Sequence, residues 1–259
     1  MKSINLKCLA RDSLRSFGYD LKRYDITSNP HYQIFKAIQK NKIDLIFDVG
    51  SNTGQFAKGL REVGYKYRIV SFEPLSSAHR ILTKVARDTK GWEVHERCAI
   101  GDINGSIKIN ISGNSVSSSI LTMLSDHSNA SPESAYIKTE ETKICTLDSL
   151  SPQYMTTENR TLIKIDTQGF EWQVLDGALK TISCAQAIMI ELSLVELYSG
   201  QRLWEAIIER LESEGFHLWS LQPAFVDPHD GRTLQLDGLF FREINYGVTK
   251  KNNYSSREL

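Results

Sequence analysis

Short apolar runs alternate with amphipathic segments along most of the chain. The apolar runs lie at residues 45–47, 69–70, 162–163 and 187–190. Uninterrupted runs of this length are typical of strands that are buried on both faces of a sheet. Between the runs, apolar side chains recur at helical spacing, as at Phe56, Leu60 and Val63. This alternation predicts an α/β fold with a mostly parallel sheet, in which helices connect the strands by right-handed crossovers.

Three regions depart from this pattern. Residues 1–42 show helical apolar spacing without an apolar run, which predicts an N-terminal helical extension. Residues 106–111 alternate polar and apolar positions, as an antiparallel strand does, and a Ser- and Asn-rich stretch follows them. Residues 216–221 and 234–241 predict a hairpin at the sheet edge, because turn-forming residues lie between them.

The composition is that of an ordinary globular protein. With 41% hydrophobic and 24% charged residues, the 259-residue chain can bury a substantial core. We expect one main domain over residues 43–244 and a polar C-terminal tail over residues 245–259. Lys and Arg total 31, as do Asp and Glu, so no net field draws the protein to nucleic acid or to anionic lipid. The expected partner is a small molecule or a glycan, and no nucleic-acid partner is expected.

Several sequence signals are absent. No window approaches 18 consecutive apolar residues, so no membrane span is expected. Charged residues interrupt the apolar positions near the N-terminus, which leaves no signal-peptide core. The 4 cysteines form no C-x-x-C pair and the 6 histidines form no closely spaced ligand pair. We therefore expect a cytoplasmic protein with free thiols and without a protein-built metal site.

A glycine-containing turn follows the first apolar run. Gly50 and Gly54 allow a ligand to approach the backbone closely, and the next helix aims its N–H groups at that ligand. Glu73 ends the following run 23 residues after Gly50, about where a carboxylate meets ribose hydroxyls. Asp48 would oppose a pyrophosphate and suits the cationic groups of S-adenosylmethionine. The turn therefore predicts a nucleoside cofactor, with the methyl donor favoured over NAD.

Five sequence blocks add a more specific signal. They are FDVGSNTG at residues 47–54, FEP at 72–74, AIGD at 99–102, TLDSL at 146–150 and IKIDTQGFE at 163–171. In order and spacing, these blocks resemble those of the FkbM-type methyltransferases, which belong to the class I S-adenosylmethionine-dependent group. The resemblance spans about residues 43–242. It implies a Rossmann-like sheet of about seven mostly parallel strands, with a last antiparallel strand and helices on both faces. It also implies S-adenosylmethionine as cofactor.

The resemblance also implies a reaction and a set of cofactor-binding residues. The reaction is methylation of an oxygen, often a sugar hydroxyl. The implied residues are Asp48, Gly50, Asn52 and Gly54 beside the methionine part, Glu73 at the ribose hydroxyls, and Cys98, Ala99 and Asp102 nearest the adenine.

Two carboxylates at the ends of neighbouring apolar runs are the candidate catalytic residues. Asp166 and Glu191 both fall at the edge where open α/β sheets bind ligands. Asp166 is expected to accept the proton of the acceptor hydroxyl or to orient that hydroxyl, and Glu191 is a second acceptor-side carboxylate. Glu171 is interpreted as a helix-dipole partner, and Lys164 as an ion-pairing residue.

Two other classes of function remain open on the sequence alone. An NAD(P)-dependent oxidoreductase or epimerase is disfavoured, because the third-glycine spacing of the dinucleotide fingerprint is missing and because Asp48 would oppose a pyrophosphate. A cofactor-binding scaffold without catalysis is disfavoured by Asp166 and Glu191, although carboxylates alone do not establish turnover.

Overall fold

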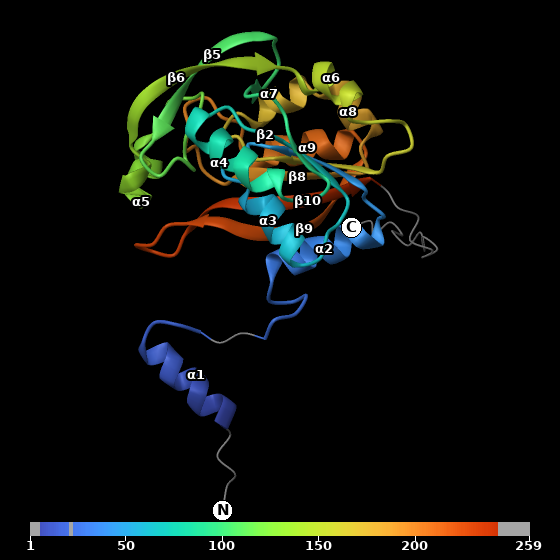
Figure 1. The fold of residues 1–259 in the computed structure, drawn as a ribbon. Helices are drawn as coiled ribbons and strands as arrows, with labels where there is room; N and C mark the ends of the chain where they lie inside the picture. Colours follow the sequence, from blue (N-terminus) through green and yellow to red (C-terminus); the bar gives the residue numbers. More distant parts are fainter. Residues whose placement is uncertain (1–5, 21–22, 243–259) are drawn as a thin grey trace, which may run out of the picture.

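The protein is described here by a computed structural model, which covers residues 6–20 and 23–242 (Figure 1). The predicted tail at residues 245–259 lies outside the described residues. The helices are α1 (Leu6–Ser16), α2 (Pro30–Lys40), α3 (Gln55–Glu62), α4 (Ser76–Arg87), α5 (Ser125–Ala130), α6 (Leu147–Leu150), α7 (Glu171–Asp176), α8 (Leu179–Cys184) and α9 (Trp204–Ser213), with the short 3-10 turns η1 (Pro132–Ser134) and η2 (Ser151–Gln153). The strands are β1 (Leu45–Val49), β2 (Arg68–Phe72), β3 (Trp92–Val94), β4 (Ala99–Ile100), β5 (Gly105–Ser112), β6 (Tyr136–Cys145), β7 (Thr161–Ile165), β8 (Ala187–Ser193), β9 (Phe216–Val226) and β10 (Thr233–Arg242).

The central sheet has seven strands in the order β3-β2-β1-β7-β8-β10-β9. The first five of these are parallel, and β10 runs antiparallel to both β8 and β9. β1 lies in the middle, where Phe47 is in register with Val70 of β2 and with Ile163 of β7. The predicted α/β fold with an antiparallel last strand is therefore confirmed. The hairpin predicted near the C-terminus is formed by β9 and β10.

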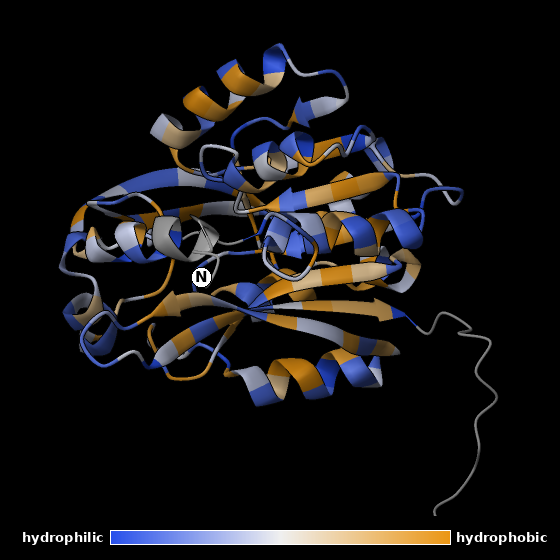
Figure 2. Cartoon of the chain, turned by 90° about the horizontal axis from the view of Figure 1, so that it is seen from below, coloured by the Kyte–Doolittle hydropathy of each residue, from blue (hydrophilic) through white to orange (hydrophobic). Residues whose placement is uncertain are grey.

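Alternate residues of each inner strand pack against different helices. In β1, Leu45, Phe47 and Val49 belong to the core cluster that includes residues of α6, α7, α8 and α9. Ile46 faces the opposite cluster, which includes residues of α2, α3 and α4. Figure 2 shows the resulting layers, with apolar strands between helices that carry both polar and apolar turns. Every inner strand is thus buried on both faces, as the continuous apolar runs predict.

The region that interrupts the strand-helix rhythm forms a sheet of its own. Its three strands are ordered β4-β6-β5, and β5 pairs antiparallel with β6 from Gly105 to Ser112. Ile109, Ile111 and Ile144 form a separate apolar cluster there with Phe170. The small sheet therefore packs on the loop that follows β7, and it brings residues 113–124 toward the end of the central sheet.

The two helices of the N-terminal region differ in their packing. Asn29 caps α2 through its side chain, which accepts a hydrogen bond from the Tyr32 amide at 2.9 Å, and Pro30 occupies the first turn. Ile34 and Ile38 of α2 are buried in the same cluster as the sheet. α1 instead lies away from the sheet and its covering helices in Figure 1. In the described part of the chain, no helix has the length and apolar character that crossing a membrane requires.

Candidate functional site

A cavity of about 400 Å³ lies where the parallel strands β1, β2 and β7 end. Its lining includes the turn after β1, residues 73–75 after β2, residues 98–100, the loop at 115–120 and residues 166–168 after β7. Ligands of open α/β sheets bind at this carboxyl edge. The cavity is therefore the candidate active site, and its chemistry depends on the turns that form it.

The turn after β1 passes very close to the loop after β7. Gly50 has a φ of +77°, and a Cβ atom added to it would lie 1.8 Å from the backbone oxygen of Asp166. Only glycine fits such an approach. The amides of Gly50 and Ser51 both donate to the carbonyl of Phe72 at 3.1 Å, which fixes the turn against β2. The backbone of residues 50–52 is consequently fixed along the wall of the cavity.

Glu73 is held by the same turn. Its Oε2 accepts a hydrogen bond from the Asn52 amide at 2.7 Å, and its Oε1 accepts one from the Leu75 amide at 2.8 Å. Burial raises the pKa of Glu73 to about 7 although both amides oppose that rise. Each carboxylate oxygen keeps acceptor capacity beyond the one amide that it binds. Glu73 can therefore accept hydrogen bonds from ligand hydroxyls without losing its support.

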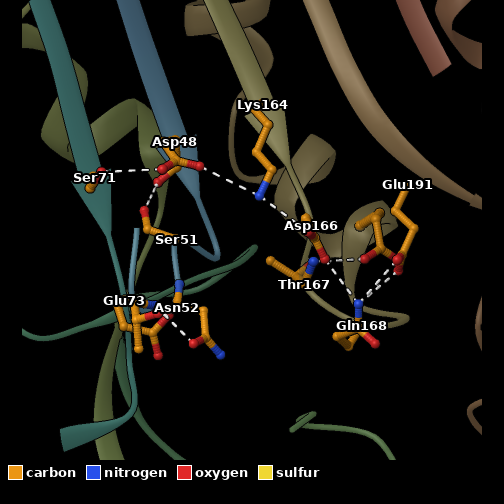
Figure 3. A network of polar contacts seen from close by, with 12 residues as sticks. Asp48, Ser51, Asn52, Ser71, Glu73, Lys164, Asp166, Thr167, Gln168 and Glu191 are labelled. Carbon is orange, nitrogen blue, oxygen red and sulfur yellow. Dashed lines mark hydrogen bonds and ion pairs between the residues drawn. The ribbon is translucent and has the colours of Figure 1, made fainter. Parts of the chain in front are cut away.

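A buried ion-pair chain connects β1 with the end of β7 (Figure 3). Lys164 Nζ lies 3.5 Å from Asp48 Oδ1 and 3.2 Å from Asp166 Oδ2. Ser71 donates to the other oxygen of Asp48 at 3.2 Å. Burial alone would lower the pKa of Lys164, but attraction to Asp166 and Asp48 outweighs it and the pKa is raised. Lys164 is therefore cationic, and its charge is shared between two carboxylates.

Gln168 holds the second oxygen of Asp166. Its side-chain nitrogen donates to Asp166 Oδ1 at 2.9 Å and to both carboxyl oxygens of Glu191 at 3.1 Å (Figure 3). Tyr198 donates its hydroxyl proton to Gln168 Oε1 at 2.9 Å, which fixes the orientation of the amide. Burial, followed by repulsion from Asp166, raises the pKa of Glu191 well above its ordinary value. Asp166 is thus held at both oxygens, beside a carboxyl group that favours its protonated form.

Glu171 organises the loop between β7 and α7. Its Oε1 accepts hydrogen bonds from the amides of Thr167 at 2.9 Å and Gly169 at 3.2 Å. Burial raises the pKa of Glu171 to about 7. The residue does not line the cavity, so its contacts support the loop rather than a ligand.

The structure places the predicted residues in two groups. Those that line the cavity are Gly50, Asn52, Glu73, Cys98, Ala99 and Asp166. Those that lie behind or beside its wall are Asp48, Gly54, Asp102 and Glu191. At Gly54, an added Cβ would lie 2.7 Å from the Trp92 ring, so this glycine allows α3 to pack on β3. Asp102 packs beside Gly177, where an added Cβ would lie 3.2 Å from the Asp102 Cα.

Asp237, His31 and Gln168 are three of the lining residues that were not predicted from the sequence. Asp237 lies on β10, and burial and then repulsion from Asp166 raise its pKa to about 6. Its signal is a lone acid inside the apolar run at residues 234–241. His31 lies on α2, and Gln168 has a left-handed φ of +55°. His31 carries no sequence signal, because its position on a helix is ordinary. Gln168 falls inside the block at residues 163–171, but nothing in the block singles out this glutamine.

The cavity has the features that a nucleoside cofactor requires. It combines a glycine turn that admits close approach, a buried carboxylate at Glu73, and an apolar wall that includes Leu75 and Ile100. These residues fit the ribose and base of S-adenosylmethionine. Among the described residues, no three His, Cys, Asp or Glu side chains are arranged to hold a metal ion.

No curated protein sequence matches the chain. Solved structures with a similar arrangement include magnesium protoporphyrin IX methyltransferase from Synechocystis with bound SAM, which is 9% identical and has a TM-score of 0.44, with 94% of this chain and 100% of that chain covered. An rRNA methylase from Streptococcus thermophilus is 10% identical with a TM-score of 0.43, covering 83% of this chain and 97% of that chain.

The family comparison is more specific. The model of the methyltransferase FkbM domain matches residues 48–218, which include the glycine turn, Glu73 and Asp166. This match confirms that the protein is an S-adenosylmethionine-dependent methyltransferase, with the predicted cofactor. On this evidence, the chain belongs to the FkbM methyltransferase family.

Proposed function

We propose that this protein transfers the methyl group of S-adenosylmethionine to a hydroxyl group of a sugar or another small hydroxylated compound. The observation that carries the proposal is the position of Asp166. Its carboxylate lines the cavity at the end of β7, beside the glycine turn, and it is held by Lys164 and Gln168. A carboxylate fixed in this way can orient a hydroxyl and accept its proton.

The cofactor would lie along the turns after β1 and β2. The methionine part would lie against residues 50–52, and the ribose hydroxyls would donate to Glu73. The base would lie between Cys98, Ala99 and the apolar wall. Asp48 and Gly54 would support this site from behind, since both are buried next to it without lining it. Asp102 would lie beyond the adenine end.

The chain's own residues would account for the hydroxyl chemistry. The bound cofactor supplies an electrophilic methyl group on a cationic sulfur. The acceptor oxygen would take this methyl group, while residues 50–52 and Glu73 would hold the rest of the cofactor in place. The hydroxyl proton passes to Asp166. The ammonium group of Lys164 lies 3.2 Å from the accepting carboxylate and holds it in place as an ion pair.

Glu191 would assist through Gln168 instead of contacting the acceptor. It lies behind Gln168, and burial together with repulsion from Asp166 raises the pKa of Glu191, which favours its uncharged form. A neutral Glu191 lowers the repulsion that a second carboxylate would exert on Asp166. We therefore assign Asp166 as the catalytic residue and Glu191 as a positioning residue.

The first test is ligand-induced thermal stabilisation. A ligand at 100 times its dissociation constant should stabilise the folded state by about 2.7 kcal/mol. We expect stabilisation by S-adenosylmethionine and S-adenosylhomocysteine, no stabilisation by NAD, and loss of both shifts in Glu73→Ala. Stabilisation by NAD alone would contradict the proposal.

The second test separates catalysis from binding. Hydroxylated acceptors are screened for uptake of a labelled methyl group, and the active ones are assayed with Asp166→Asn. We expect this variant to bind S-adenosylhomocysteine normally and to lose turnover. The matched control is Asp176→Asn, which alters a half-exposed ion pair with Arg210 outside the cavity lining and should keep full turnover. Equal turnover in both variants would show that Asp166 is not the base.

A further inference from the structure

One part of the cavity has no place in the proposed cofactor site. We call it the side chamber, and its lining residues are His31, Lys164, Met189, Gln222, Pro223 and Asp237. Lys164 is in register with Met189 of β8, and Asp237 of β10 is in register with Glu191 of β8 and with Gln222 of β9. Paired residues in neighbouring strands point to the same side of a sheet. The register therefore gathers these side chains on the face that α2 and α3 cover.

α2 closes the side chamber from the other side. The His31 ring packs over Gly59 of α3, where an added Cβ would lie 2.4 Å from His31 Cδ2. Gln222 donates to Gln33 Oε1 at 2.7 Å, which fastens β9 to α2. The glycine inside α3 and this cross-link together hold the His31 side chain against the chamber.

Most of the side chamber lies outside the part of the chain that the family shares. The FkbM domain model matches residues 48–218, whereas His31, Gln222, Pro223 and Asp237 fall on either side of that range. The proposed cofactor residues all fall inside it. The division indicates that the shared region binds the donor and that the flanking elements recognise the acceptor.

The charges of the side chamber favour one kind of acceptor. Among the described lining residues, Lys164 is the only lysine or arginine, and Asp48 and Asp166 already share its charge. Asp237 adds a carboxylate, and Asp166 lies near enough to raise the pKa of Asp237. An anionic group brought here would lose water and meet like charges. A hydroxyl or an ammonium group would instead donate a hydrogen bond.

We infer that the side chamber recognises the acceptor, that Asp237 binds it through a hydroxyl or ammonium donor, and that acceptors carrying a phosphate or carboxylate group are excluded. This inference rests on the proposed function, because the chamber is assigned to a methyl acceptor. It goes further in naming the charge class of the acceptor and the residue that selects it.

The test uses three probes that share the same sugar ring and differ in net charge. Methyl glucoside is neutral, glucosamine is cationic and glucuronate is anionic. Their binding to the full chain saturated with S-adenosylhomocysteine is measured by calorimetry. We expect methyl glucoside and glucosamine to bind at least about tenfold more tightly than glucuronate, which corresponds to about 1.4 kcal/mol. Glucuronate binding as tightly as glucosamine, or no binding by the first two probes, would overturn the inference.

Variants assign the selectivity to Asp237. Asp237→Asn should weaken glucosamine binding about tenfold, so that the affinities for glucosamine and glucuronate come closer together. The affinity for S-adenosylhomocysteine should not change. Asp230→Asn is the matched control, because this residue lies on the exposed turn of the same hairpin. An unchanged order of affinities in Asp237→Asn would overturn the role of Asp237.

A second variant covers the case in which Asp237→Asn does not fold. Gln222→Lys adds a positive charge opposite Asp237 and should strengthen glucuronate binding. No gain in this variant would overturn the assignment of the chamber. Failure of S-adenosylhomocysteine to bind the unaltered protein would instead contradict the proposed function, so the two failures are distinguishable.

Discussion

The ammonium group of Lys164 lies 3.5 Å from Oδ1 of Asp48, and within the described chain that oxygen has no hydrogen-bond donor. Asp48 is fully buried on β1, and Lys164 is nearly so on β7. The carboxylate at the centre of the sheet is therefore stabilised by one cation. The same ammonium group also forms an ion pair with Asp166. The stability of the fold and the charge of the site therefore depend on one side chain.

Lys164→Met should destabilise the protein strongly. Removing the ammonium group leaves Asp48 buried without its counter-ion, and breaking one side of a buried pair costs about 3–5 kcal/mol. Unfolding in urea measures the loss. The control is Glu93→Gln, which removes an exposed pair with Arg68 and should cost less than about 1 kcal/mol. Similar losses in the two variants would show that Lys164 is not the counter-ion that Asp48 requires.

Gly50→Ala should destabilise the folded protein far more than Gly200→Ala does. Both glycines have a φ of +77°, so both substitutions carry the left-handed backbone penalty of about 1–2 kcal/mol. At Gly50 the added Cβ would also lie 1.8 Å from the Asp166 carbonyl, whereas at Gly200 it would meet nothing within 4 Å. Thermal unfolding should show a small loss for Gly200→Ala and a loss of several kcal/mol for Gly50→Ala. Equal losses would refute the close approach of the two turns.

The ligand-free protein should lose stability as the pH rises from about 5 to 8. Burial raises the pKa of Glu73 from 4.5 to about 7, so the folded state holds a proton that the unfolded state has already released. The contribution of Glu73 is fully present below pH 4.5 and is lost as the pH passes its folded pKa.

Glu73→Gln provides the check on this dependence. The variant cannot titrate at this position, so its free energy of unfolding should fall less steeply over the same pH range. The difference in slope should be on the order of 1 kcal/mol per pH unit. Glu171 retains its own raised pKa and leaves a residual slope. A variant as steep as the original protein would place the titration elsewhere.

Tyr198→Phe should lower turnover more than it lowers cofactor binding. The buried hydroxyl donates to Gln168 Oε1 at 2.9 Å, and without it the amide that holds Asp166 loses its fixed orientation. Loss of this buried bond should cost about 1–3 kcal/mol of stability. We expect a reduced kcat with an unchanged dissociation constant for S-adenosylhomocysteine. Tyr67→Phe, at a largely exposed tyrosine, should change neither value.

The part of the cavity that we assign to the cofactor could be predicted, because its signals are local in the sequence. The glycine turn adjoins an apolar run, and Glu73 ends the next run, so their meeting follows from strand order alone. The acceptor half could not be predicted in the same way. His31 and Asp237 meet across more than 200 residues of chain, and only the packing of α2 and the register of β10 bring them together.

Local geometry accounts for the remaining differences. The apolar stripe at residues 172–182 suggests one helix, but the structure has α7 and α8, separated at Gly177 and Ala178. An added Cβ at Gly177 would lie 1.8 Å from the Gly101 carbonyl, so the chain must pass that point without a side chain. Gln168 likewise has a left-handed φ, at a position where its side chain contacts Asp166 and Tyr198. Neither contact is visible in a pattern of apolar and polar positions.

The position of β10 gives the protein a defined order of assembly. It lies between β8 and β9 although it is the last described strand of the chain, so β8 keeps a free edge until residues 233–242 have been made and have paired. A nascent chain can form the glycine turn after β1 early. Until β10 pairs, however, the exposed edge of β8 can pair with other chains. The last described strand both closes that edge and carries Asp237, so the pairing of β10 with β8 would protect the sheet edge and complete the side chamber together.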